Sequence, residues 1–128
     1  MLNRSGILKA TYATTKQILA NVELQSSVGC IVPQSLGVSV GGKTIAKAGT
    51  PIKIDLQSLN TAVVKADKTT IMNAVLLHDV DVTAGNANGT ALIFGFVNVN
   101  RVDTDVQTAI TTALGGAGVS PLLVFMKV

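Results

Sequence analysis

The two most apolar runs of the chain lie close together, at residues 71–82 and 91–97, with a segment rich in Asn and Gly between them. In the first run, one set of alternating positions ends in Asp79 and Asp81, as in a strand whose far end faces water. The second run is apolar at odd and even positions, so its middle should be covered on both faces. Asn and Gly tolerate the positive φ of a reversal. The pattern predicts a β-hairpin over residues 69–100 as the centre of the fold.

Shorter elements are predicted on both sides of this hairpin. Short strands separated by Pro and Gly turns are expected within 28–40, at 44–46, at 52–55 and at 62–64. Apolar residues at helical spacing from Val102 to Leu114 predict an amphipathic helix that ends at Gly115-Gly116. The last eight residues, 121–128, are apolar and rich in β-formers, which indicates a final strand.

The first 25 residues contain many Thr residues and scattered apolar residues, without a periodic face. We therefore expect an extended N-terminal arm over residues 1–27 and a β-rich domain over 28–128 that folds without the arm. The predicted fold class is mainly β (α+β), with one amphipathic helix.

Composition describes a single domain with few charges. Of 128 residues, 48% are hydrophobic and 13% are charged. A chain of this length and composition can bury a sizeable hydrophobic core. Part of its weakly charged surface is expected to bind a partner. Through Lys53 there are six basic residues against Glu23 alone, and after it four against six Asp. No cluster of Lys and Arg interleaved with aromatics occurs, so no nucleic-acid partner is expected.

The sequence gives no sign of export or membrane insertion. Its start lacks a signal-peptide apolar region, and it has no run of 18 apolar residues. We expect a protein made in the cytoplasm, with no membrane partner. The single cysteine, Cys30, cannot form an internal disulfide and is expected to be a small buried hydrophobe.

Residues 37–44 satisfy the phosphate-loop formula of Gly, any four residues, Gly-Lys-Thr. A phosphate loop needs a helix that starts at the Lys-Thr pair, but here Gly49 and Pro51 would break it after one turn. The alternating β-branched residues favour a hairpin with a turn at Gly41-Gly42 and Lys43 in water. No nucleotide cofactor is expected.

His78, Asp79 and Asp81 form the other group that could suggest a metal site or an acid/base pair. Consecutive residues of a strand point to opposite faces, so His78 should face away from both carboxylates. The chain has no second His and a single Cys, so other ligands are scarce. We expect structural roles at a strand end, hence no catalytic, cofactor-binding or metal-binding residues, and no enzyme.

Several segments, taken in order, resemble a known family. The segments are 47–51 (KAGTP), 73–83 (NAVLLHDVDVT), 91–98 (ALIFGFVN) and the helix after Arg101. Over roughly residues 45–114 the chain resembles the head decoration (cement) proteins of tailed bacteriophages, the lambda-like group. The resemblance implies a small β-barrel or β-tulip domain with a helix, which forms trimers on the expanded capsid. It also implies an N-terminal arm that pairs with capsid-protein strands, and no catalysis.

The resulting expectation is a structural decoration protein of the virion. It would bind the major capsid protein on the outer surface of a phage head as a homotrimer and stabilise the expanded shell. Two alternatives stay open: another small phage fibre or tail accessory module, and a nucleotide-dependent enzyme built on the Gly-Lys-Thr loop.

Overall fold

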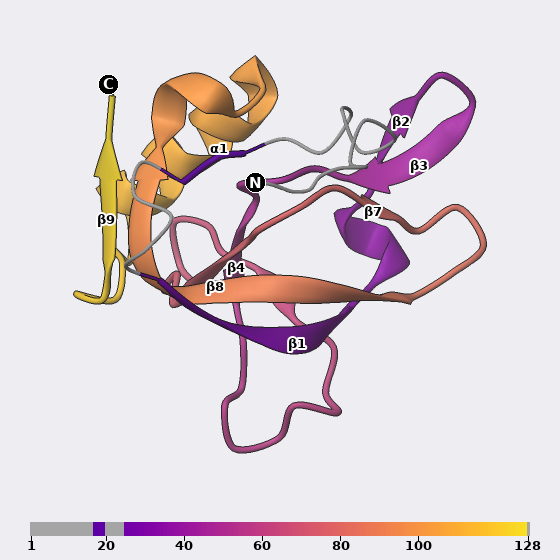
Figure 1. The fold of residues 1–128 in the computed structure, drawn as a ribbon, viewed down its shortest axis with the longest axis horizontal. Helices are drawn as coiled ribbons and strands as arrows, with labels where there is room; N and C mark the ends of the chain where they lie inside the picture. The colour runs from indigo at the N-terminus through magenta and orange to yellow at the C-terminus, as the bar shows by residue number, and fades with distance from the viewer. Residues whose placement is uncertain (1–16, 20–24, 128) are drawn as a thin grey trace, which may run out of the picture.

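The computed structural model describes residues 17–19 and 25–127, which form two β-sheets and one α-helix (Figure 1). The fold is mainly β, as the sequence predicts. The strands are β1 (Ser26–Val32), β2 (Val38–Val40), β3 (Lys43–Ala46), β4 (Pro51–Lys53), β5 (Val64–Lys65), β6 (Ala74–Leu76), β7 (Val80–Asp81), β8 (Ala87–Asn98) and β9 (Leu123–Met126). The helices are the 3₁₀ turns η2 (Gln34–Leu36) and η3 (Val99–Arg101), and α1 (Thr104–Gly115).

The larger sheet has six strands in the order β1-β8-β6-β4-β5, with β9 also paired to β8; the smaller has the order β2-β3-β7. The expected closed barrel is wrong, because the end strands β1 and β5 form no ladder within the described part of the chain. One backbone hydrogen bond joins these edges, from Val63 N–H to Ile31 O (3.0 Å). The 12-residue strand β8 is the central element, since β1, β6 and β9 all pair with it.

The predicted central hairpin is only partly correct. Strands β6 and β8 pair antiparallel, with Val75 opposite Leu92. However, the first apolar run bends after Leu76, and its second half becomes β7, which pairs with β3 in the other sheet. The bend places the Asp79 carboxylate 2.7 Å from the N–H of Ala48, which donates to it. One predicted strand is therefore two strands in two sheets.

The middle of β8 is not covered on both faces, contrary to the prediction. Phe94 is 38% exposed, whereas Leu92 and Val97 are fully buried. β6 pairs with β8 only at Ala91 and Leu92. Beyond that point β8 has β9 as its neighbour on that side, and the shared outer face of these two strands keeps large apolar side chains exposed.

The core consists of two clusters, and the alternation of β6 divides its residues between them. Val75 belongs to the cluster beneath α1, whereas Ala74 and Leu76 belong to a second cluster that also contains Cys30 and Ile52. All three β6 residues are fully buried because one cluster covers each face of the strand. Cys30 is buried, as predicted.

Helix α1 and strand β9 occur where the sequence predicts them. The helix buries Val106, Ile110 and Ala113, and it ends at Gly115-Gly116. At 12 residues α1 is too short to cross a bilayer, and no helix in the described ranges is long and apolar enough to do so. β9 pairs parallel to β8.

Part of the predicted arm belongs to the domain. Ile18 and Leu19 are 0% and 6% exposed and lie in the core cluster beneath α1. Asn98 N–H donates to Ile18 O (2.8 Å), and Leu19 forms an antiparallel bridge with Val97 of β8. The predicted boundary at residue 28 therefore does not hold for these residues or for the start of β1. Residues 1–16 and 20–24 lie outside the described residues.

Candidate functional site

The Gly-Lys-Thr pattern is the turn of the β2–β3 hairpin. Gly41 and Gly42 have φ of +57° and +84°, and they connect Val40 to Lys43, which are paired across the two strands. Lys43 is exposed and begins β3, where a phosphate loop requires the first turn of a helix. The predicted turn is confirmed.

Lys43→Ala is expected to be silent. The side chain is exposed, and a substitution at an exposed position of this kind changes stability by no more than about 0.5 kcal/mol. Thermal unfolding of the two proteins, together with titration of ATP and GTP, checks the result. Nucleotide binding by the original chain that this substitution abolishes would contradict the turn assignment.

His78, Asp79 and Asp81 lie at the bend between β6 and β7, and each carboxylate has a structural partner. Asp79 accepts the hydrogen bond from Ala48 N–H, and Asp81 accepts one from Thr83 N–H (2.9 Å). Hydrogen bonds from the Thr83 side chain and backbone lower the pKa of the Asp81 carboxyl. His78 is exposed. The geometry assigns the two carboxylates to holding backbone turns.

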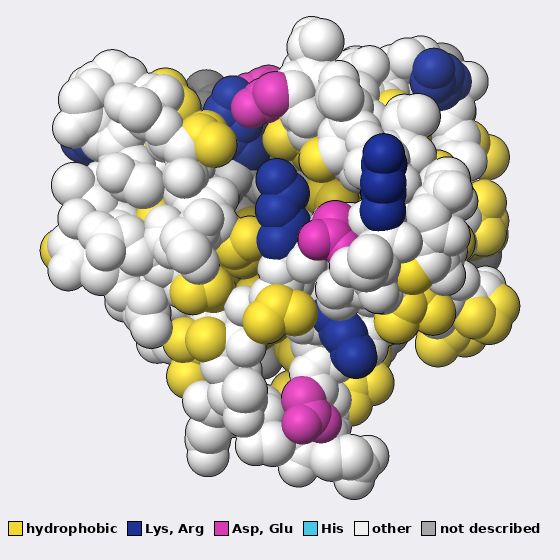
Figure 2. All heavy atoms as spheres, turned by 180° about the vertical axis from the view of Figure 1, so that it is seen from behind, with side chains coloured by type: hydrophobic (Ala, Val, Ile, Leu, Met, Phe, Trp, Pro, Cys, Tyr) yellow, Lys and Arg dark blue, Asp and Glu magenta, His cyan; other side chains and the backbone are white. Residues whose placement is uncertain are grey.

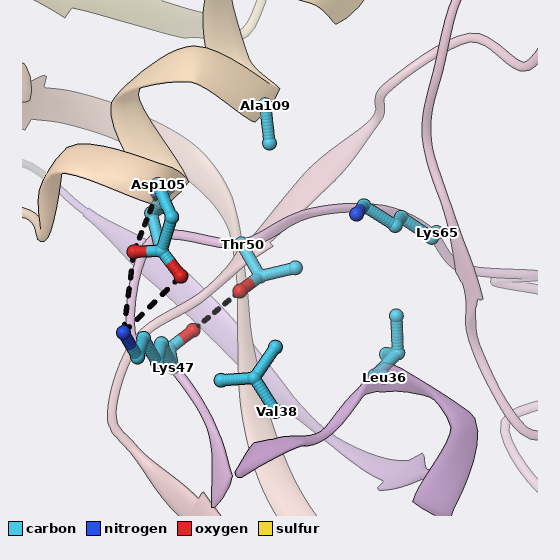
Figure 3. A pocket seen from close by; sticks show the side chains of 8 residues that line it. Leu36, Val38, Lys47, Thr50, Lys65, Asp105 and Ala109 are labelled. Atoms are coloured by element: carbon cyan, nitrogen blue, oxygen red, sulfur yellow. Dashed lines mark hydrogen bonds and ion pairs between the residues drawn. The ribbon is translucent and has the colours of Figure 1, made fainter. Parts of the chain in front are cut away.

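The turn at Lys47 joins three parts of the fold. The Lys47 ammonium lies 3.1 Å from an Asp105 carboxylate oxygen, as Figure 3 shows. It also lies 3.2 Å from a carboxylate oxygen of Asp103, and both acidic residues are at the start of α1. The Thr50 hydroxyl donates to Lys47 O (2.6 Å), which closes the turn. Acidic residues at a helix N-terminus also complement its dipole. No local pattern in the sequence predicts this ion-pair cluster, because Lys47 and the two acidic residues are more than 50 positions apart.

Gly49 packs this turn directly against the helix. Its φ is +89°, and a Cβ added there would lie 2.5 Å from a methyl carbon of Val102. Gly49 N–H donates to Leu76 O (2.7 Å), which connects the turn to β6. Segments 47–51, 73–83 and 91–98 and the helix after Arg101 are thus held together by direct contacts.

Removing the Lys47 charge is expected to weaken the attachment of α1. The hydrogen bonds that the Lys47 ammonium donates to the carboxylates of Asp105 and Asp103 raise the Lys47 pKa above its ordinary value of 10.5. Their stabilising effect is fully present below that value and is lost as pH rises through the higher folded-state pKa. Because the side chain is 20% exposed, Lys47→Met should cost about 0.5–1 kcal/mol at pH 7.

Urea unfolding at pH 7 and at a series of pH values rising above 10.5 measures this effect, with Lys53→Met as the control for an exposed lysine on β4. The difference between Lys47→Met and the original chain should shrink at the higher pH. A difference that persists there would show that the lysine stem, rather than its charge, is responsible.

The hollows of the described surface contain little reactive chemistry. A cavity of about 50 Å³ beside Lys47 is lined by Leu36, Val38, Thr50 and Ala109, among others, and has room for only a few waters (Figure 3). A wider hollow of about 470 Å³ lies between β1 and the loop at Leu59. Its only titratable group is the Cys30 thiol, whose pKa is raised by burial, so the thiol is a poor nucleophile.

No group of three or more His, Cys, Asp or Glu residues able to hold a metal ion occurs among residues 17–19 and 25–127. Charged side chains on the face shown in Figure 2 are scattered between uncharged ones.

Exposed apolar residues are the more distinctive surface feature. We define the β9 strip as the exposed face of β9 and the neighbouring part of β8, consisting of Phe94, Phe96, Leu122, Val124 and Met126. Hydrophobic side chains are visible along the β9 side of the molecule, at the right of Figure 2. Part of this strip can be read from the sequence, because Leu122, Val124 and Met126 occupy alternate positions of the predicted last strand and so share one face.

Comparison of the chain with protein-family models, with curated proteins and with solved structures gives no match. The family resemblance therefore rests on the four segments quoted above.

Proposed function

We propose that the chain is a structural decoration protein that binds the outer surface of a bacteriophage head and stabilises the expanded shell. Its partner is the major capsid protein, it acts as a homotrimer, and it has no catalytic role. In this proposal residues 25–127 form a β-tulip-like body, and the shell-gripping part of the arm lies before Gln17.

The observation that carries the proposal is the contiguity of the resembling segments. They are distant in sequence, yet the Lys47 turn contacts β6 through Gly49, the bend at Asp79 through Ala48, and α1 through its ion pairs. The segments that carry the likeness therefore form one contiguous part of the fold, which is what the proposal requires of them.

The surface supports a binding role. Eleven large apolar side chains of the described residues are exposed: nine on β2, on β5, in the loop after β4 and in the β9 strip, together with Ile71 before β6 and Leu114 of α1. Few charges accompany them. An oligomer that contacts the shell through several such apolar patches at once would bind it stably even when each contact is weak.

The test is co-sedimentation of the purified protein with expanded, undecorated capsids of its parent phage. Saturable binding, with a higher disruption temperature of the decorated shell, is the expected result. Electron microscopy of the same particles then gives the positions and the symmetry of the bound protein. Binding to isolated tails but to no capsid would replace the proposal by the tail accessory alternative.

A further inference from the structure

Among the described strands, β9 is at an edge of the larger sheet. It pairs on one side with β8 in parallel register, from Leu123 opposite Gly95 to Met126 opposite Asn98. No other described strand pairs with it, and Figure 1 shows it as the outermost strand on its side of the molecule.

The direction of the β9 backbone groups follows from this ladder. Gly95 N–H donates to Leu122 O (3.1 Å), and the parallel register then directs the N–H and C=O of Val124 towards β8. The corresponding groups of Leu123 and Phe125 point away from β8, towards the open edge.

Four backbone groups remain at this edge. Leu123 N–H donates to Ser120 O (3.2 Å), which leaves the C=O of Leu123, both groups of Phe125 and the N–H of Lys127. No hydrogen bond from residues 17–19 or 25–127 reaches them. This set is symmetric about Phe125: an acceptor two residues before it matches a donor two residues after it.

The side chains at the edge lack the usual protection. Leu122, Val124 and Met126 are 52%, 42% and 38% exposed, and no charge or proline lies between Pro121 and Lys127. Proteins usually protect edge strands with charges, prolines, bulges or a covering segment. An unprotected, apolar and hydrogen-bonding edge is suited to an extended strand.

We propose that β9 pairs antiparallel with β9 of a second copy of this chain, about a two-fold axis at Phe125. Phe125 then faces Phe125 of the second copy, and Leu123 faces Lys127, so all four open backbone groups become paired. Val124 faces Met126, which joins the two apolar strips into one. Lys127 faces Leu123 of the second copy rather than its Lys127, so no like charges lie opposite each other in this pairing.

This contact goes beyond the proposed function and does not depend on it. It is isologous and two-fold, so it joins single chains into dimers. If the chain forms trimers through another surface, the same contact links trimers, and it closes into a pair of trimers where its two-fold axis crosses the three-fold axis at a right angle. Breaking the contact then returns single chains or single trimers, with half the mass of the dimer or of the paired trimers.

The experiment measures the mass of the full-length protein by light scattering and sedimentation over a range of concentrations. Val124→Lys and Met126→Glu each place like charges near one another across the axis and remove an apolar contact. Each should halve the mass and weaken association by at least about tenfold. The double variant places the introduced ammonium opposite the introduced carboxylate of the second copy, twice, and should regain the original mass.

Leu56→Lys is the matched control, because Leu56 is 49% exposed in the loop after β4, away from β9. It should leave the mass unchanged. Thermal unfolding of each variant shows that the exposed positions tolerate the change. The proposal is overturned by a mass that neither single substitution alters, or by a double variant that stays dissociated.

Discussion

Leu92→Asp should abolish folding, whereas Phe94→Asp, two residues further along β8, should fold. Leu92 is fully buried, and burying a side chain of this size contributes roughly 1.5–3 kcal/mol. The substitution also places an unpaired carboxylate in the core, which costs several kcal/mol more. Together these losses approach the whole stability of a typical domain, about 5–15 kcal/mol. Phe94 is 38% exposed, so a carboxylate there stays hydrated.

Circular dichroism and urea unfolding of the two variants check this contrast. Leu92→Met is the control, since a volume-conserving apolar exchange usually costs less than about 1.5 kcal/mol. If Phe94→Asp is as damaging as Leu92→Asp, the outer face of β8 is covered within the single chain and the exposed position of Phe94 is wrong.

Removal of residues 1–25 should strongly destabilise the domain, whereas removal of residues 1–16 should not. The longer deletion takes Ile18 and Leu19 out of the core beneath α1, and each buried side chain contributes roughly 1.5–3 kcal/mol. It also removes the bond from Asn98 N–H to Ile18 O. The shorter deletion retains all these contacts. Urea unfolding of both truncated proteins and of the full chain gives the difference.

The full chain with Ile18→Ala and Leu19→Ala serves as the control, because it loses the same buried side chains without shortening the chain. It should show much of the loss caused by the longer deletion. Equal stability of both truncated forms would mean that these two residues do not hold the domain together.

The same pair of proteins separates folding from function. The form that begins at Gln17 should stay folded, and by the proposed function it should bind expanded capsids much more weakly than the full chain. If this form binds capsids as strongly as the full chain, the capsid-binding residues lie in the domain after residue 16 rather than in the arm.

Local patterns predicted the elements whose partners are close in sequence. The helix followed from the spacing of Val106, Ile110 and Ala113 and from the glycines at its end. The β2–β3 turn followed from Gly41-Gly42, since adjacent glycines supply the positive φ of a two-residue turn. The likeness of four segments could be read from the sequence, but their contact around Gly49 could not.

Three expectations failed because they depended on distant contacts. The first apolar run bends after Leu76, and the bend is held by the Asp79 carboxylate, which accepts the N–H of Ala48, 31 residues earlier. Ile18 and Leu19 show no periodic face of their own, yet β8 and α1 provide a place for them. Phe94 looks like a core residue by hydrophobicity, but a register shift in the ladder with β1, where Ser26 faces Phe94 and Ser27 faces Leu92, puts it on the other face of β8 from Leu92.

Short stretches of sequence were enough to predict the mainly β class, the helix, the glycine turn, the final strand and the burial of Cys30. Each of these depends on backbone preferences or on the period of apolar residues within a short segment. The folded chain was needed to show which strands share a sheet and that Lys47 pairs with Asp103 and Asp105. It was also needed to show that, among residues 17–19 and 25–127, the larger sheet does not close and β9 has a strand on one side alone. Hydrogen bonds between strands and contacts between faces join residues tens of positions apart, and the alternation within one strand carries no information about which strand lies beside it.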